Sequence, residues 1–290
     1  MVGFPAGGPT DAIARIVAQK LTDNLGQQFF VENIGGAGGN TAAGQVARVT
    51  PDGYTIMAIS TGFVVNPSLY AKVPYDPVKD FAPVTLVAVS PNVVVVNPQV
   101  AGQDAAGTGA AHQGQSRQIQ LRRARRRIDA ASGRRAVPAR LPSSTWCTCL
   151  SPVLGRRSRQ RSAGTRRSPS PRCRLPCRRC RADNCARSGV ASTERAAGMP
   201  DVPTFAEQGV KDQDADTLTG IVAPAGTPKE IVDLLYREIA KIVAQPDVKE
   251  RLTVLGFKPV ANTPDQFGAR IRLEMDKWGK VVRDAKLRIE

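Results

Sequence analysis

The uneven distribution of charge is the sequence feature that most constrains how this chain can fold. Residues 101–198 carry 22 Lys+Arg and 4 Asp+Glu, a net charge of +18, whereas residues 1–100 and 199–290 each carry a net charge of −1. All 22 basic residues of the middle third are Arg, and all six Cys and the single His also lie there. Two ordinary segments therefore flank a third of a different kind.

The middle segment lacks the sequence pattern of a folded domain. It shows no sustained hydrophobic period of 2 or 3.6 residues, and Trp146 is its only aromatic residue. A composition dominated by Arg, Ser, Ala and Pro predicts a disordered segment over residues 101–189. Clustered Arg can neutralise phosphates, so an Arg-rich nucleic-acid-binding chimera is the alternative interpretation. The segment has no aromatic stacking platform and no known nucleic-acid-binding pattern, so we expect no specific nucleic-acid partner.

The Cys and His residues of the middle third do not predict a metal site or an enzyme. Cys173, Cys177, Cys180 and Cys185 lack the paired CxxC spacing of structural zinc sites. His112 has no evident nucleophile partner, and no pair of carboxylates is suitably placed for acid–base chemistry. We therefore expect no metal, no cofactor and no catalytic residue.

The two flanks predict an α/β fold. In the N-terminal third, strands alternate with helices, which predicts a mostly parallel sheet. The elements expected there are a glycine turn at 4–11 with a helix ending at Gly26, a strand at 29–31, a second glycine turn at 35–40 with a helix through Val46, and strands at 54–59, 84–89 and 92–96.

The C-terminal third is also clearly punctuated. Its expected elements are a strand at 218–223, a helix from a Thr227–Glu230 capping box to Ala244, a short helix at 246–255 and a last helix from Thr263 to about Lys286.

The glycine turns are the candidate ligand-binding features. A glycine-rich turn that opens a helix presents backbone N–H groups to an anion, although a capped strand–helix turn gives the same pattern. Together with the end of strand 54–59, both turns would meet at the carboxyl edge of the sheet, where open α/β folds bind ligands. The candidate ligand-binding residues are Phe4, Pro5, Ala6, Gly7, Gly8, Thr10, Asp11, Asn40, Ser60 and Thr61, with Thr10 as a side-chain donor.

The flanks resemble the solute-binding proteins of tripartite tricarboxylate transporters, the Bug-type receptors, over about 190 of the 290 residues. The matching motifs, in order, are residues 3–11 (GFPAGGPTD), 31–33 (VEN), 36–40 (GAGGN), 51–55 (PDGYT), 66–70 (NPSLY), 75–84 (YDPVKDFAPV), 199–204 (MPDVPT) and 223–228 (APAGTP). The resemblance implies a monomeric periplasmic receptor of the two-domain, type II binding-protein class. Such a receptor closes on a small carboxylate and delivers it to membrane permease subunits.

The same resemblance implies a domain division. Residues 1–100 plus 218–290 would form domain one, with its first strand, before Gly3, truncated. Residues 101–189 would replace domain two. From residue 190 to residue 217 the sequence would again follow that of the family. No signal peptide precedes the first motif, so the chain translated as given is expected to stay in the cytoplasm although the family is periplasmic.

The middle segment is interpreted as a frameshifted translation. When its codons are shifted by one base, residues 103–109, 113–119 and 127–133 permit family-like sequences, the last of them G-S-T-P-H-L. When the reading frame is shifted the other way, residues 145–150 permit V-H-V-P. Trp and Cys have very few codons, so the shifted frame can encode few other residues there. Residues 153–160 and 183–188 match in the same offset. GC-rich codons out of frame also yield Arg rather than Lys. The literal chain is therefore predicted to be an impaired receptor, as from a pseudogene or a sequencing error.

Overall fold

The computed structural model describes residues 1–96, 147–149, 186–196, 198–210 and 215–289 of the chain. By internal contacts the described residues divide into a first unit, 1–91 with 216–290, and a second unit within 92–215. Most of the segment predicted to be frameshifted and disordered lies outside the described residues, as do His112 and the Cys173–Cys185 cluster. The predicted domain boundaries stay a prediction.

The first unit contains a four-stranded sheet in the order β1-β6-β2-β7. These strands are β1 (Met57–Ser60), β2 (Phe81–Ser90), β6 (Thr217–Pro224) and β7 (Lys258–Pro259). Every neighbouring pair is antiparallel, so the expectation of a mostly parallel sheet was wrong for the named strands. The reason is that β6, from the far end of the chain, inserts between β1 and β2 and runs against both. Among the described residues, parallel pairing occurs only as single bridges, which in the first unit join Val2 to Asn33 and to Ala58, and Tyr70 to Ile289.

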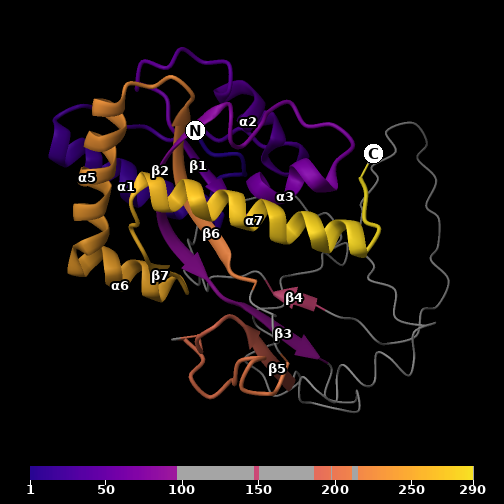
Figure 1. Ribbon diagram of the computed structural model, residues 1–290. Coiled ribbons are helices and arrows are strands. Elements are labelled where there is room, and N and C mark those ends of the chain that lie inside the picture. The colour runs from indigo at the N-terminus through magenta and orange to yellow at the C-terminus, as the bar shows by residue number, and fades with distance from the viewer. Residues whose placement is uncertain (97–146, 150–185, 197, 211–214, 290) are drawn as a thin grey trace, which may run out of the picture. The chain divides into compact units, whose positions relative to one another are not determined.

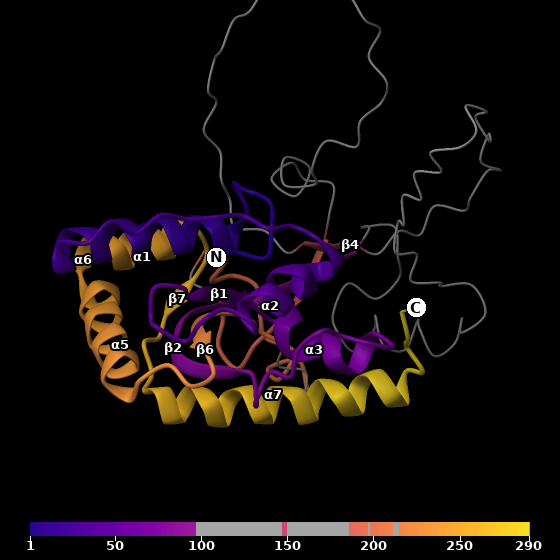
Figure 2. The same cartoon turned by 90° about the horizontal axis from the view of Figure 1, so that it is seen from above.

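Helices cover both faces of this sheet. They are α1 (Pro9–Leu25), α2 (Asn40–Val46), α3 (Gly62–Leu69), α5 (Lys229–Ala244), α6 (Pro246–Val254) and α7 (Pro264–Asp284). One hydrophobic core joins α1, α5 and α6 to β2 and β6, through residues such as Leu21, Val84 and Ile239. A second core joins α2, α3 and α7 to the opposite face, through Phe63, Leu86 and Phe267. Figures 1 and 2 show α1 and α7 on opposite sides of the strands.

Two predicted helix boundaries are confirmed and one predicted cap is wrong, while α3 was not predicted. The strand expected at 29–31 is not among the named strands, and pairing there is limited to the bridge from Val2 to Asn33. Gly26 ends α1 in the left-handed conformation, with φ of 65°, as predicted. Thr263 and Gln266 form the capping box of α7, with the Gln266 N–H donating to Thr263 Oγ1 at 3.3 Å. The predicted Thr227 capping box was wrong, because the Thr227 hydroxyl donates to the Pro224 carbonyl at 2.8 Å and α5 has no side-chain cap.

The second unit contains a three-stranded antiparallel sheet in the order β4-β3-β5. Its strands are β3 (Asn92–Val96), β4 (Cys147–Cys149) and β5 (Ala186–Ala191). A small core of Val93, Val190, Ala196 and Val202 packs around β3 and β5. Among the described residues of both units, no helix is both long and apolar enough to cross a membrane.

Candidate ligand-binding site

Three backbone segments of the first unit end at the same edge. The Val2 N–H donates to the Glu32 carbonyl at 2.8 Å, and the Ala58 N–H donates to the Met1 carbonyl at 2.9 Å. Because the bridges from Val2 are parallel, the segments around Val2, Asn33 and Ala58 run in one direction. Each is followed by a loop and a helix, which brings three loops together where the segments end.

The first loop, Phe4–Gly8, leads into α1 through a conformation that requires glycine. Gly7 has φ of +83°, and Gly8 is the N-cap residue of α1. The first helical hydrogen bond runs from the Ala12 N–H to the Gly8 carbonyl at 2.9 Å. The N–H groups of Thr10 and Asp11 therefore precede the first intrahelical bond, at the positive end of the helix dipole. Such an end favours an anion.

Asp11 holds the first loop in place rather than facing outward. Its side chain is buried, and its carboxylate accepts hydrogen bonds from the Gly7 N–H at 2.8 Å, Arg15 Nε at 3.0 Å and Asn33 Nδ2 at 2.8 Å. Burial alone would raise the pKa of the Asp11 carboxyl, but these three donors outweigh burial and lower it below its ordinary value. The Asp11 oxygens are thus engaged within the protein.

Asn33 links the first loop to the segment before the second one. Its Nδ2 also donates to the Phe4 carbonyl at 3.0 Å, and its Oδ1 accepts from Arg15 Nη2 at 3.0 Å. The sequence analysis missed this role, although Asn33 belongs to the VEN motif.

The second loop packs directly against the first. Between Gly36 and Gly39 every residue has a positive φ, including Ala37 at 45°. A Cβ on Gly3 would lie only 3.0 Å from the Gly39 Cα, and a Cβ on Gly39 would lie 3.6 Å from the Phe4 ring. Close backbone approach therefore explains Gly3 and Gly39, whereas positive φ explains Gly7.

Asn40 anchors the second loop in a buried polar network. Its Oδ1 accepts from Asn66 Nδ2 at 2.7 Å and from the Tyr75 hydroxyl at 3.3 Å. Asn66 Nδ2 also donates to the Gly38 carbonyl at 3.1 Å. Burial raises the pKa of the Tyr75 hydroxyl, which therefore stays protonated and acts as a donor. These bonds occupy the Asn40 oxygen, so a ligand contact from Asn40 falls to its nitrogen atoms.

The third loop, Ser60–Gly62, completes the edge. Ser60 is the last residue of β1, and Thr61 is the N-cap residue of α3. Thr61 Oγ1 accepts from the Leu218 N–H at 3.0 Å, which ties this loop to β6. A Cβ on Gly62 would lie 3.3 Å from the Gly38 carbonyl oxygen, so the third loop touches the second.

One further polar residue at this edge was missed by the sequence analysis. Thr219 of β6 stands directly opposite Ser60 of β1 in the antiparallel register. Its side chain is 1% exposed, and Thr219 Oγ1 has no hydrogen-bond partner within the described structure. The only sequence signal was a threonine inside an otherwise apolar strand.

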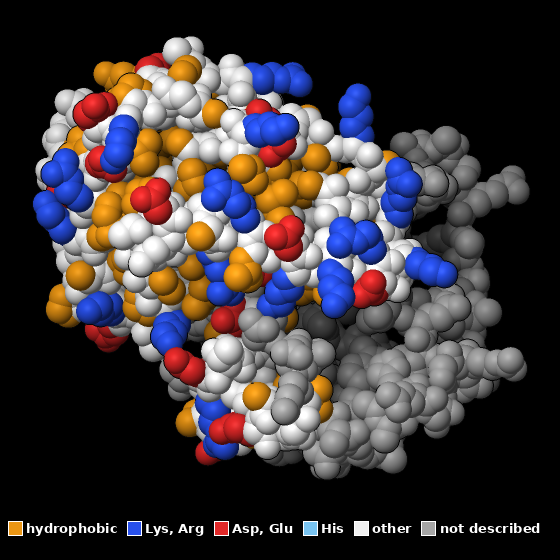
Figure 3. All heavy atoms as spheres, in the orientation of Figure 1, with side chains coloured by type: hydrophobic (Ala, Val, Ile, Leu, Met, Phe, Trp, Pro, Cys, Tyr) orange, Lys and Arg blue, Asp and Glu red, His pale blue; other side chains and the backbone are white. Residues whose placement is uncertain are grey.

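The three loops can hold an anion with neutral groups. Arg15 of α1 donates hydrogen bonds to Asp11 and Asn33 beside these loops, and it is paired with the Asp11 carboxylate. Figure 3 shows Lys and Arg over much of the visible face of the molecule, with Asp and Glu among them. Within the described ranges, no group of three or more His, Cys, Asp or Glu side chains is placed to hold a metal ion. Backbone N–H groups and hydroxyls are therefore the available ligand donors.

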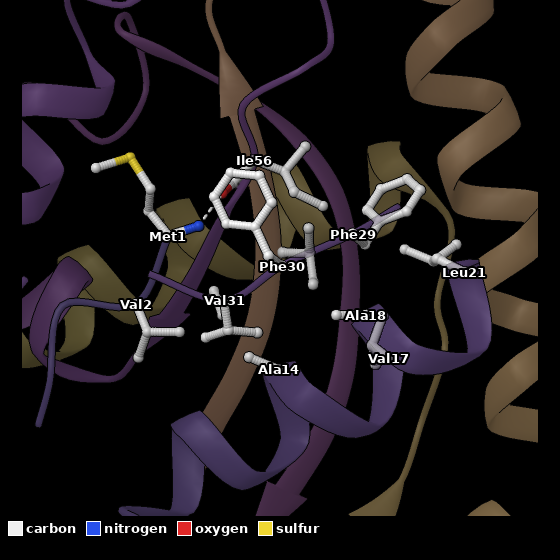
Figure 4. Close-up of a pocket in the computed structure, with 12 residues that line it drawn as sticks. Met1, Val2, Ala14, Val17, Ala18, Leu21, Phe29, Phe30, Val31 and Ile56 are labelled. Atoms are coloured by element: carbon white, nitrogen blue, oxygen red, sulfur yellow. Dashed lines mark hydrogen bonds between the residues drawn. The ribbon is translucent and has the colours of Figure 1, made fainter. Parts of the chain in front are cut away.

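A separate apolar cavity lies between α1 and the segments that hold Met1, Phe30 and Ile56 (Figure 4). Its volume is about 40 Å³, far below the roughly 300 Å³ at which small-molecule sites begin. The Met1 ammonium donates to the Ile56 carbonyl beside it at 2.6 Å, and burial lowers the pKa of that amine. Apolar walls and small size exclude this cavity as a carboxylate site.

Comparisons with known proteins match the chain to one family. The family model for the tripartite tricarboxylate transporter family receptor matches residues 13–105 and 177–287. A UPF0065 protein from the tcbD-tcbE intergenic region of Pseudomonas sp. strain P51 is 35% identical over 298 residues, covering 99% of this chain and 85% of the relative.

Solved structures agree with this match at the level of the fold. The periplasmic binding protein BugD is 26% identical, with a TM-score of 0.70 and coverage of 99% of this chain and 97% of BugD. A protein of R. palustris solved with adipate is 24% identical, with a TM-score of 0.70 and coverage of 99% and 97%, and shares the fold. The chain therefore belongs to the tripartite tricarboxylate transporter receptor family, whose members are periplasmic solute-binding proteins that take small carboxylates and work with membrane components of the transporter.

Proposed function

We propose that this chain is a solute receptor whose first unit captures one carboxylate of a small organic acid at the three-loop edge. The observation that carries the proposal is the meeting of the loops Phe4–Gly8, Gly36–Gly39 and Ser60–Gly62, with the first turn of α1 opening there. The captured acid would be delivered to permease subunits in the membrane, with the receptor acting as a monomer and carrying out no catalysis.

The chemistry of capture follows from the donors at this edge. The N–H groups of Gly8, Thr10 and Asp11 lie at the N-terminal end of α1. The Thr10 hydroxyl belongs to the first turn of that helix, and the hydroxyls of Ser60 and Thr61 belong to the third loop. Hydrogen bonds to a charged oxygen are stronger than neutral ones, so a few preset donors can hold a carboxylate without a salt bridge. Asp11 and Asn33 fix the loop, so little ordering remains to be done on binding.

Isothermal titration of the chain with succinate, malate, adipate and citrate tests this function. We expect at least one acid to bind, and adipamide, which lacks the carboxylates, not to bind. Thr10→Val should weaken binding, because it removes a hydroxyl at the start of α1. Thr253→Val, in α6, is the matched control, because the Thr253 hydroxyl donates to the Lys249 carbonyl of its own helix at 2.8 Å. Equal binding of the acids and adipamide would contradict the proposal.

We also propose that the printed chain is an impaired receptor, because residues 101–189 are an out-of-frame translation. The family model supports this interpretation, since its two matched ranges leave out residues 106–176. That gap falls within the Arg-rich segment. The match of both flanks favours a receptor over the alternative of a nucleic-acid-binding chimera.

Resequencing of the DNA through codon 200 tests the frame. If resequencing shows that the inserted or deleted bases near codons 101, 133–145 and 189 were sequencing errors, the true protein has an ordinary second domain. If the slips are real, the locus is a pseudogene, and a frame-restored chain should bind its acid at least about a hundredfold more tightly, because the second half of the enclosing site is regained. A coding sequence without the out-of-frame matches would overturn the frameshift.

A further inference from the structure

We propose that the Thr219 hydroxyl is a ligand contact that donates a hydrogen bond to the carboxylate captured at the three-loop edge. This inference rests on the proposed function and adds a residue from β6, a strand that supplies none of the three loops. Thr219 Oγ1 is buried and has no hydrogen-bond partner within the described residues. A buried hydroxyl without a partner carries a desolvation cost that hydrogen bonding to a ligand would recover.

The strand register places this hydroxyl on the α1 side of the sheet. Side chains of β6 alternate between the faces, with Leu218 and Val222 in the core under α7 and Ile221 and Ala223 in the core under α1. Thr219 shares the face of Ile221. Its directly opposed partner in β1 is Ser60, so the two hydroxyls lie on the same face of an antiparallel pair.

The first turn of α1 lies at the same position along the sheet as Ser60 and Thr219. Ala14 of α1 packs with Ala58 of β1 in one cluster, and Ser60 is the next residue on that face toward the end of β1. The helix begins at Pro9, one turn closer to the loops than Ala14. Thr219 and Ser60 therefore lie beneath the end of α1 whose N–H groups are proposed to hold the anion.

A second contact ties Thr219 to the third loop. The N–H of the preceding residue, Leu218, donates to Thr61 Oγ1 at 3.0 Å. This bond fixes β6 against the N-cap of α3, so the position of Thr219 is set by the same loop that carries Ser60 and Thr61. In this arrangement a hydroxyl on a rigid central strand adds a hydrogen-bond donor beneath the donors on the loops.

The test is the near-isosteric substitution Thr219→Val, measured for both binding and stability. If Thr219 contacts the ligand, the affinity for the tightest-binding acid among succinate, malate, adipate and citrate should fall about tenfold or more, as expected for a lost hydrogen bond to a charged group. The melting temperature without ligand should stay the same or rise by about 2–4 °C, because a buried hydroxyl without a partner has been removed. Thr219→Ser, which keeps the hydroxyl, should bind within about threefold of the unchanged chain.

Thr85→Val is the matched control. Thr85 is also a buried threonine in the central sheet, but its hydroxyl donates to the Asn262 carbonyl at 2.7 Å. This substitution should lower the melting temperature and leave affinity unchanged. NMR titration up to about 20 mM acid keeps weak binding measurable. Binding by Thr219→Val equal to that of the unchanged chain would overturn this inference alone. Failure of the unchanged chain to bind any of the four acids would overturn the proposed function and this inference with it.

Discussion

Asp11 determines the conformation of the first loop at the scale of single residues. We expect Asp11→Ala to lower the free energy of unfolding by about 2 kcal/mol, because the Gly7 N–H and Asn33 Nδ2 would lose their shared buried acceptor. Urea denaturation measures this change. Asp23→Ala, at an exposed position of the same helix, should change stability by less than about 0.5 kcal/mol. Equal effects of the two substitutions would show that the loop does not depend on Asp11.

The Asp11 carboxyl also predicts how the loop responds to acid. Its pKa in the folded protein is lowered from the ordinary 3.8, so its contribution to stability is complete above pH 3.8 and is lost as pH falls through the lower, folded value. In an NMR titration, the Gly7 amide resonance should shift with a midpoint below pH 3.8. Asp11→Asn should abolish that shift. A midpoint above pH 3.8 would contradict the prediction.

Gly220 and Phe267 fix α7 on the sheet at the scale of secondary-structure elements. A Cβ on Gly220 would lie 2.2 Å from Phe267 Cζ, and the Phe267 side chain is fully buried. Gly220→Ala should therefore destabilise the chain by about 2 kcal/mol or more through overpacking. Gly268→Ala is the control within α7, where a Cβ meets only the Pro83 Cγ at 3.4 Å. It should stabilise by about 0.5–1 kcal/mol, and thermal unfolding separates the two signs. A stable Gly220→Ala variant would refute this packing.

The sequence predicted local features of the fold better than long-range ones. The end of α5 at Ala244 and the end of α1 at Gly26 follow from periodicity and from a terminal glycine, which neighbouring residues set. The position of β6 between β1 and β2 depends on pairing between segments far apart in the sequence, such as Ser60 with Thr219 and Ser90 with Thr217, which no local pattern encodes. Two threonines before prolines illustrate the same limit, because Thr263 caps α7 whereas the Thr227 hydroxyl turns back to Pro224.

The candidate site shows the same division between local and long-range information. Its glycine loops were evident from composition, because glycine marks unusual backbone conformations and close approach. The groups that hold those loops, Asn33, Asn66 and Tyr75, come from separate parts of the chain and meet only in three dimensions. Thr219 is beyond sequence analysis for a different reason, since a lone threonine in an apolar strand is compatible with an ordinary core position.

At the scale of the whole molecule, the net charge of +16 predicts sequence-independent binding to polyanions. The excess resides in residues 101–198, whose clustered Arg neutralise phosphates without distinguishing bases. Two 20-base-pair duplexes of unrelated sequence should bind with dissociation constants within about threefold of each other, and both affinities should fall steeply with salt. Fluorescence anisotropy at several salt concentrations measures this. A frame-restored chain is the control and should not bind, because it loses the Arg clusters. A preference of about a hundredfold or more for one duplex would instead support the nucleic-acid-binding alternative.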